Sequence, residues 1–163
     1  MAIEILKADL SNPDHQCAVL AMMEAYSCDP MGDGHGLSDY AKENLISGLS
    51  EHPTTIVFLA LDNKTPCGIA TCFRGFSTFA AKPLINISDF FVEPRLRGKG
   101  IGNQLLFAIE NEARRIGCCK LSLEVQENNP VARGIYTRFG FQQAVYAADS
   151  DGGGSQYMVK QLT

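Results

Sequence analysis

The stretch FFVEPRLRGKGIG, residues Phe90–Gly102, decides how this chain is interpreted. It begins in an apolar, β-type run and ends in an amphipathic pattern that predicts a helix over residues 101–116. The alternating glycines between them let the backbone turn tightly, with no Cβ in the way of a ligand. Free N–H groups and the positive end of the helix dipole then converge on this turn. We therefore predict a phosphate-type anion site here, made more cationic by Arg97 and Lys99.

The spacing of the glycines excludes two common phosphate-binding loops. The chain has no G-x-x-x-x-G-K-[ST] run, which a P-loop requires. The dinucleotide-binding pattern G-x-G-x-x-G also fails, because its third glycine would fall on Asn103 or Leu105. The pattern that remains is Arg97-x-x-Gly100-x-Gly102.

A second segment, residues 129–141, carries the spacing N-x-x-A-x-x-x-Y followed by G-F. Its fixed positions are Asn129, Ala132 and Tyr136. The two segments, in this order and at this separation, resemble the two signatures of the GNAT superfamily of N-acetyltransferases. The resemblance covers residues 56–141 well and the part before them only by architecture.

This resemblance implies an acyltransferase that uses acetyl-coenzyme A as co-substrate. Such an enzyme transfers the acetyl group to a primary amine of a small molecule or peptide, by direct attack in a ternary complex. The alternative is a non-catalytic acyl-CoA-binding or sensing domain, which would keep the phosphate loop but lack a working acid or base. The cofactor-binding residues that the resemblance implies are Phe91, Val92, Arg97, Gly98, Lys99, Gly100, Ile101, Gly102, Asn103, Asn129 and Ala132.

Periodicity and turn residues predict the element order β-α-α-β-β-β-α-β-α-β-β. The expected strands cover residues 2–8, 54–61, 66–76, 85–92, 120–125, 141–147 and 156–161. The expected helices cover residues 13–26, 39–50, 101–116 and 131–138. This order agrees with the α/β (α+β) GNAT fold, a mixed and mostly antiparallel sheet of about seven strands. In that fold the fourth and fifth strands splay apart, and the pantetheine arm of the cofactor lies between them.

Length and composition fit one soluble domain over residues 1–163, with 45% hydrophobic and 20% charged residues. We expect neither a membrane span nor a signal peptide. The six cysteines lack C-x-x-C spacing, which favours a reducing cytoplasmic setting and no metal. A net charge of −4 makes nucleic acid an unsuitable partner. A homodimer through the terminal strands is expected as a possible assembly.

The chemistry needs a proton donor for the leaving thiolate and a base for the amine. Tyr136 matches the family tyrosine and is the candidate general acid. Glu124 precedes Asn129 at the spacing that ribosomal-protein alanine acetyltransferases use for a base glutamate. Asp89 is the rival base, in a segment similar to polyamine and thialysine acetyltransferases. Those enzymes carry a catalytic glutamate at the position where this chain has Ser88. A water relay is the third candidate for removing the amine proton.

The acceptor site is expected near the Gly/Asp-rich loop of residues 27–36. Asp29, Asp33 and His35 are the candidates for contact with a cationic amine. A solvated turn is the alternative interpretation. A calcium site is excluded because the loop lacks the twelve-position ligand pattern. The sequence does not identify the amine.

Overall fold

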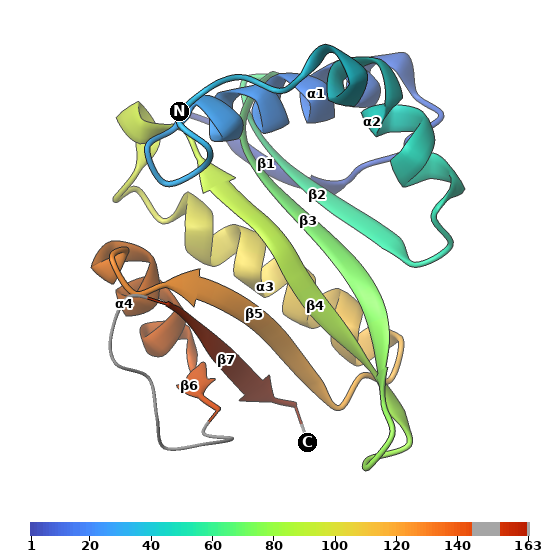
Figure 1. Ribbon diagram of the computed structural model, residues 1–163, viewed down its shortest axis with the longest axis vertical. Coiled ribbons are helices and arrows are strands. Elements are labelled where there is room, and N and C mark those ends of the chain that lie inside the picture. Colours follow the sequence, from blue (N-terminus) through green and yellow to red (C-terminus); the bar gives the residue numbers. More distant parts are fainter. Residues whose placement is uncertain (145–153, 163) are drawn as a thin grey trace.

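The computed structural model describes residues 1–144 and 154–162, and it confirms the predicted order of elements (Figure 1). The described helices are α1 (Pro13–Cys28), α2 (Asp39–Glu51), α3 (Ile101–Arg115) and α4 (Pro130–Phe139), with a short 3-10 turn at Pro94–Leu96. The described strands are β1 (Ile3–Lys7), β2 (Thr55–Asp62), β3 (Thr65–Ser77), β4 (Lys82–Val92), β5 (Lys120–Gln126), β6 (Gln142–Gln143) and β7 (Ser155–Gln161). Residues 145–147 of the strand predicted over 141–147 lie outside the described residues.

The strands form one seven-stranded sheet in the order β1-β2-β3-β4-β5-β7-β6. Neighbours are antiparallel except β4 and β5, which are parallel and are joined through α3. The predicted mixed, mostly antiparallel sheet is therefore confirmed. A parallel pair needs a crossover connection, and the helix that follows the glycine turn supplies it.

Helices cover both faces of this sheet (Figure 1). Helix α3 packs across β1 to β5 on one face, with α4 beside it. Its apolar side chains recur at helical spacing and are buried, which explains the amphipathic pattern of this segment in the sequence. These side chains are Ile101, Leu105, Leu106, Ile109 and Ala113. Helices α1 and α2 form a second core with the other face, around Val19, Leu59 and Ile69.

Local capping fixes where the helices begin. The Asn12 side chain accepts a hydrogen bond from Asp14 N–H at 2.9 Å, and Pro13 follows as the first residue of α1. Ser38 accepts from Ala41 N–H at 3.1 Å and starts α2. Helix α3 ends before Gly117, which has a φ of +82°. These short-range signals explain why the predicted helix boundaries lie within a few residues of the observed ones.

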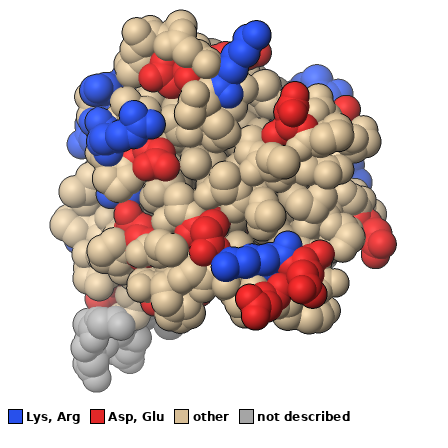
Figure 2. Space-filling view, turned by 90° about the horizontal axis from the view of Figure 1, so that it is seen from above, with Lys and Arg blue, Asp and Glu red and all other residues tan. Residues whose placement is uncertain are grey.

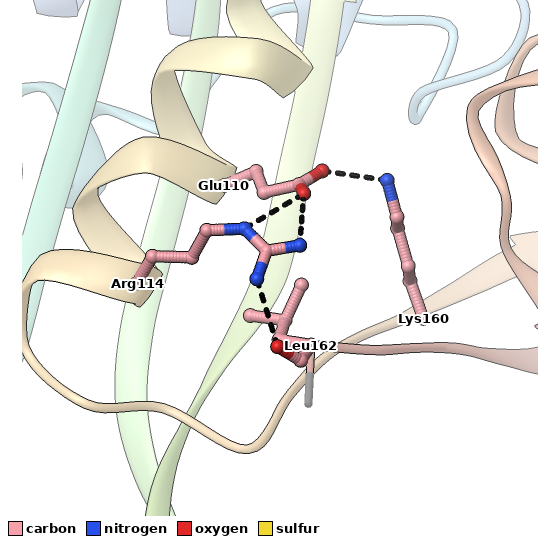
Figure 3. A network of polar contacts seen from close by, with 4 residues as sticks. All are labelled: Glu110, Arg114, Lys160 and Leu162. Carbon is pink, nitrogen blue, oxygen red and sulfur yellow. Dashed lines mark hydrogen bonds and ion pairs between the residues drawn. The ribbon is translucent and has the colours of Figure 1, made fainter.

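An ionic network ties the C-terminal strand to α3 (Figure 3). Glu110 accepts hydrogen bonds from Lys160 of β7 at 2.6 Å and from Arg114 at 2.7 Å. Arg114 also donates to the Leu162 carbonyl at 2.8 Å. Partial burial alone would raise the pKa of Glu110, but the hydrogen bonds from Lys160 and Arg114 hold it below its usual range.

A second carboxylate of α3 holds the opposite edge of the sheet. Glu112 accepts from Lys7 of β1 at 2.8 Å and from Arg115 at 2.6 Å. The hydrogen bonds from Arg115, together with Lys7, lower the pKa of Glu112 to about 2. Helix α3 therefore anchors both outer parts of the sheet as well as its centre.

The molecular surface carries mixed charge on the face shown in Figure 2. Lys and Arg side chains form small groups with Asp and Glu side chains next to them, and much of this face is uncharged. No continuous basic surface crosses the described residues visible in this view.

We predict that Glu110→Gln destabilises the fold in a pH-dependent way. The pKa of Glu110 is lower in the folded chain than in the unfolded one, so its charge stabilises the fold above the ordinary glutamate pKa of about 4.3. The substitution should lower the free energy of unfolding by about 1 kcal/mol at pH 7. The difference from the wild type should shrink as the pH falls below that value toward the folded-state pKa. Urea unfolding between pH 7 and pH 3 measures both.

The matched control is Glu4→Gln, an exposed glutamate of β1, which should change stability little at any of these pH values. A Glu110→Gln effect that stays constant from pH 7 to pH 3 would assign the loss to packing and not to charge.

Candidate active site

The sheet opens between β4 and β5, and a cavity lies at this opening. The two strands pair only from Ile85 with Leu121 to Ile87 with Leu123. Beyond this point β4 stays paired with β3, and β5 stays paired with β7 (Figure 1). The predicted splaying of the fourth and fifth strands is therefore confirmed. The resulting cavity has a volume of about 860 Å³.

Six parts of the chain line this cavity. They are the C-terminal half of β4, the glycine turn with the start of α3, the end of β5 with the loop after it, helix α4, the end of α1 with the loop that follows it, and Ser155 at the start of β7. Of the residues predicted to bind the cofactor or to act in catalysis, those that line it are Phe91, Val92, Arg97, Gly98, Gly100, Ile101, Gly102, Asn103, Glu124, Asn129, Ala132 and Tyr136. Lys99 and Asp89 do not line it.

The glycine turn has the geometry of an anion site. Gly98 and Gly100 have φ values of +77° and +84°, which side chains other than glycine rarely adopt. Gly100 is the N-cap of α3, and the first helical hydrogen bond runs from Gln104 N–H to its carbonyl at 3.1 Å. The N–H groups of residues 101–103 therefore precede that bond and point out of the helix end. Since this end borders the cavity, an anion bound there would meet the positive end of the helix dipole.

Arg97 is bound to the protein and is not a free cation beside the turn. Its Nε donates to the Val92 carbonyl at 2.9 Å, and its Nη2 donates to Asp29 Oδ2 at 3.0 Å. The guanidinium also lies over the Phe91 ring, 5.6 Å from the centroid. Arg97 thereby connects the end of β4, the glycine turn and the loop after α1.

The open edge of β4 offers main-chain groups to the cavity. Glu93 N–H donates to the Cys67 carbonyl of the β3 segment at 2.9 Å. Because main-chain groups alternate along a strand, those of Phe91 also point to β3, and those of Val92 and Phe90 point to the opening. The resemblance implied Phe91 and Val92; the register indicates Val92 and Phe90 for this edge.

Tyr136 is buried at the base of the cavity. Its ring packs edge-on against Phe90 and Phe141, with centroids 5.7 and 5.8 Å away. This burial raises the pKa of the hydroxyl above its usual range, so the phenol stays protonated at neutral pH. Helix α4, which carries Tyr136, is capped by the Asn129 side chain through Ala132 N–H at 3.2 Å. That bond gives Asn129 and Ala132 a structural task in addition to lining the cavity.

The two candidate bases lie in different surroundings. Glu124 is exposed, lines the cavity and accepts a hydrogen bond from Ser155 Oγ at 3.2 Å. Asp89 is half-buried and does not line the cavity, and its carboxylate accepts a hydrogen bond from the Thr71 hydroxyl. Burial raises the pKa of Asp89 in spite of that hydrogen bond.

A β-bulge decides where Asp89 points. Thr71 pairs with Asp89 and Cys72 with Ile87, so Ser88 is an extra residue in β4. After the bulge the side chains exchange faces: Asp89 and Phe91 face α1, and Phe90 faces α4. Without this extra residue, Asp89 would point into the core under α3.

The predicted acceptor residues are not brought together. Asp29 is buried, lines the cavity and pairs with Arg97. Asp33 and His35 are exposed and do not line the cavity. The His35 carbonyl accepts from Ser27 Oγ at 2.7 Å, which holds the loop to α1.

Several residues of the site were missed from the sequence. Tyr26 and Met31 form the wall on the α1 side, and the ring of Tyr26 lies 5.6 Å from that of Phe91. Burial and the carboxylates of Asp89, Asp29 and Asp33 raise the pKa of Tyr26. Tyr26 follows Val19 and Met22 at helical spacing, which indicates an apolar helix face. The spacing does not show whether a residue on that face lines a cavity or is packed in the core.

A second cavity of about 720 Å³ adjoins the first. Asn103 and Arg138 line both cavities, and Phe107 and Phe139 contribute aromatic surface to the second one. Arg138 follows Gly134 by one helical turn, and a Cβ on Gly134 would come within 3.1 Å of its Nη1. The missing side chain at Gly134 thus makes room for the guanidinium.

The described residues provide neither a metal-binding cluster nor a membrane-spanning helix. No group of three or more His, Cys, Asp or Glu side chains among them could hold a metal ion. No described helix combines the length and the apolar character needed to cross a bilayer. All six cysteines are free.

Comparison with known proteins identifies relatives of this arrangement. A family model described as acetyltransferase (GNAT) family matches residues 19–141. The uncharacterized N-acetyltransferase YhfO of Bacillus subtilis is 28% identical over 101 residues, which are 62% of this chain and 68% of that protein. The spermine/spermidine N(1)-acetyltransferase of the same species is 39% identical over 77 residues, 47% of this chain and 49% of that enzyme. The match thus spans about half the length of this second relative.

Solved structures share the fold. An integron cassette protein from the mobile metagenome of V. cholerae superposes with a TM-score of 0.76 and 24% identity, over 94% of both chains. The PaiA N-acetyltransferase from Thermoplasma acidophilum, in complex with coenzyme A, has a TM-score of 0.73 and 20% identity, over 99% of this chain and 100% of that one. At these identities the likeness concerns the fold alone.

We predict that Gly100→Ala weakens coenzyme A binding about tenfold, because a residue with a Cβ resists the φ of +84° and disturbs the direction of the N–H groups. Isothermal titration calorimetry measures the dissociation constant. The matched control is Gly117→Ala, at the other end of α3, with a φ of +82° and equally open space around the added Cβ. Equal weakening in both variants would refute an anion site at the turn.

Proposed function

We propose a specific reaction for this chain, which belongs to the acetyltransferase (GNAT) family and is an acyltransferase that uses acetyl-CoA. In this reaction it acetylates a primary amine of a small molecule or peptide, by direct attack of the amine in a ternary complex. The observation that carries this proposal is the cavity between β4 and β5. It is lined by the glycine turn, by Tyr136 and by the wall that the end of α1 forms. One end suits a diphosphate, and the other can admit an amine.

In this proposal the chain holds acetyl-CoA at three places. The N–H groups of the glycine turn bind the pyrophosphate, with Asn103 beside them. The open N–H of Val92 and the open main-chain groups of Phe90 bind the amides of the pantetheine arm, as an added strand would; the Val92 carbonyl is already bound to Arg97. The adenosine end extends toward the second cavity, where the Arg138 guanidinium suits a phosphate and the rings of Phe107 and Phe139 suit a base.

The acetyl group moves from sulfur to nitrogen, and the amine proton finally rests on the released thiol. The hydroxyl of Tyr136 donates a hydrogen bond to the departing sulfur. A thiol has a pKa of about 8.5, and that of Tyr136 lies above the ordinary tyrosine value of about 10. Complete proton transfer from Tyr136 would therefore be uphill. We infer that the hydroxyl stabilises the thiolate while the proton lost by the amine restores neutrality.

The amine must be neutral when it attacks, and an ordinary alkylamine has a pKa of about 10.4. We propose Glu124 as the group that accepts its proton, directly or through water, because this carboxylate borders the cavity. Asp89 remains the rival. It does not line the cavity itself, but it lies close enough to Tyr26, which does, to influence that hydroxyl.

The distribution of charge supports a cationic amine as acceptor. Arg97 precedes the glycine turn and is paired with Asp29, and Arg138 lines both cavities, whereas the Glu124 carboxylate borders the first cavity from β5. A cationic acceptor would be attracted to the acidic part. The similarity to a spermine/spermidine acetyltransferase agrees with this choice, although Ser88 stands where the polyamine and thialysine enzymes carry a glutamate. A peptide amine is the second acceptor class.

A non-catalytic acyl-CoA-binding domain would bind coenzyme A equally well. The two functions separate when the protein is incubated with acetyl-CoA and a panel of amines and thiol release is recorded. Turnover of at least one amine is expected; binding without any turnover would favour the sensing function.

The setting and assembly of the protein also stay proposals. We propose a reducing, cytoplasmic setting, in which the six free cysteines remain reduced. We also propose a homodimer formed through the terminal strands, since β6 and β7 lie at one end of the sheet.

We predict that Tyr136→Phe lowers kcat by about tenfold to a hundredfold and changes the dissociation constant of acetyl-CoA less than twofold. The phenyl ring preserves the packing against Phe90 and Phe141 and removes only the hydroxyl. Steady-state kinetics and calorimetry measure the two quantities. An unchanged kcat would exclude this hydroxyl from the reaction.

We predict that Glu124→Gln lowers kcat/KM and flattens its acidic limb, whereas Asp89→Asn keeps that limb. The reverse result would identify Asp89 as the base, and the limb would then lie above the ordinary aspartate pKa because burial raises the pKa of this carboxyl. A pH–rate profile of the wild type and both variants decides between them. If both variants retain the limb, a water relay carries the proton.

A further inference from the structure

Asp29 has a different environment from the one expected of an amine-binding carboxylate. Its side chain is only 7% exposed and is already paired with Arg97 at 3.0 Å. Its second oxygen accepts a hydrogen bond from Met31 N–H at 2.9 Å. A buried carboxylate whose charge is already balanced by a guanidinium attracts a second cation only weakly.

The segment that Asp29 begins, residues 29–37, is held mainly to α1, and we name it the acceptor-side loop. Gly32 N–H donates to the Asp29 carbonyl at 2.8 Å, and Leu37 N–H donates to the Glu24 carboxylate at 2.9 Å. The loop contributes Asp29 and Met31 to the cavity, next to Tyr26. It therefore shapes the end of the cavity where the amine is proposed to enter.

Within the described residues, one polar link joins this loop to the turn proposed to bind the pyrophosphate, and that link is the pair of Arg97 with Asp29. Arg97 immediately precedes Gly98, so its backbone is fixed whenever the turn is fixed. Its side chain is also held to β4 by the Val92 carbonyl and the Phe91 ring. A rigid guanidinium offers a better-defined partner to Asp29 than a mobile one.

We propose that Asp29 is a positioning residue that couples the two substrate sites. When acetyl-CoA occupies the glycine turn, the backbone of the turn loses mobility, and the Arg97 side chain, already held to β4, passes this restraint on to Asp29 and the acceptor-side loop. Binding of the second substrate costs less entropy once this loop is ordered, which gives positive coupling without a large change in shape. This inference rests on the proposed function, because it assigns the α1 end of the cavity to the amine.

The direct test is hydrogen–deuterium exchange of residues 27–37 with and without saturating coenzyme A, in the wild type and in Asp29→Asn. Asparagine keeps the shape and the bond to Met31 N–H but removes the charge that holds Arg97. We expect coenzyme A to slow exchange of this segment severalfold in the wild type and to have little effect in Asp29→Asn. The matched control is Glu43→Gln, an exposed charge loss on α2, which should behave as the wild type does.

A kinetic cycle gives the second readout. Asp29→Asn and Arg97→Gln should each raise the KM for the amine about tenfold, and the double variant should also raise it about tenfold and not a hundredfold. For Asp29→Asn we expect kcat and the dissociation constant of coenzyme A to stay within about twofold. A merely structural role would reduce the amount of active enzyme and hence kcat, and would leave KM unchanged.

The inference is overturned if coenzyme A leaves exchange of residues 27–37 unchanged in the wild type, or slows it equally in Asp29→Asn. It is also overturned if the two substitutions act additively on KM. Absence of turnover with every amine would contradict the proposed function instead, and the exchange experiment would still decide the coupling because it needs coenzyme A alone.

Discussion

The structure depends on the two parallel strands β4 and β5. Each is paired along its length with the neighbour on its other side, but the two are paired with each other over only three residues. β4 stays paired with β3 as far as Val92, and β5 stays paired with β7 as far as Gln126. Between them the pairing stops at Ile87 and Leu123. The unpaired main-chain groups beyond that point would be costly if they were buried without a partner. A ligand with amide groups can satisfy them, which is why an opening in this sheet implies a binding site.

Helix α3 stabilises the sheet in spite of this opening, and its N-terminus lies where the diphosphate of the proposed ligand would bind. Its buried apolar side chains pack against one face of the sheet, and each buried Ile or Leu contributes on the order of 1.5–3 kcal/mol. Glu110 and Glu112 attach β7 and β1 to the same helix, so strands on both sides of the opening are fixed to one rigid element. The first residue of that helix follows directly from the glycine turn. The core and the anion site are therefore parts of one element.

The sequence was sufficient for the elements because their signals are local. Asn12, Ser38 and Gly117 mark helix ends through caps and turns, and the apolar period of α3 marks its buried face. The surroundings of individual side chains were harder to predict from the sequence. Asp29 looked like a free carboxylate because its partner Arg97 lies 68 positions away in the chain. The direction of Asp89 depends on an extra residue at Ser88, and an apolar or polar pattern does not reveal such a bulge.

The most direct measurement of the central claim is a titration of the ¹⁵N-labelled protein with coenzyme A, followed through its amide resonances. The account predicts that the largest shifts belong to the amides of residues 98–103 and to those of Phe90 and Val92 on the open edge of β4. Large shifts confined to other parts of the molecule, or none at millimolar coenzyme A, would contradict it.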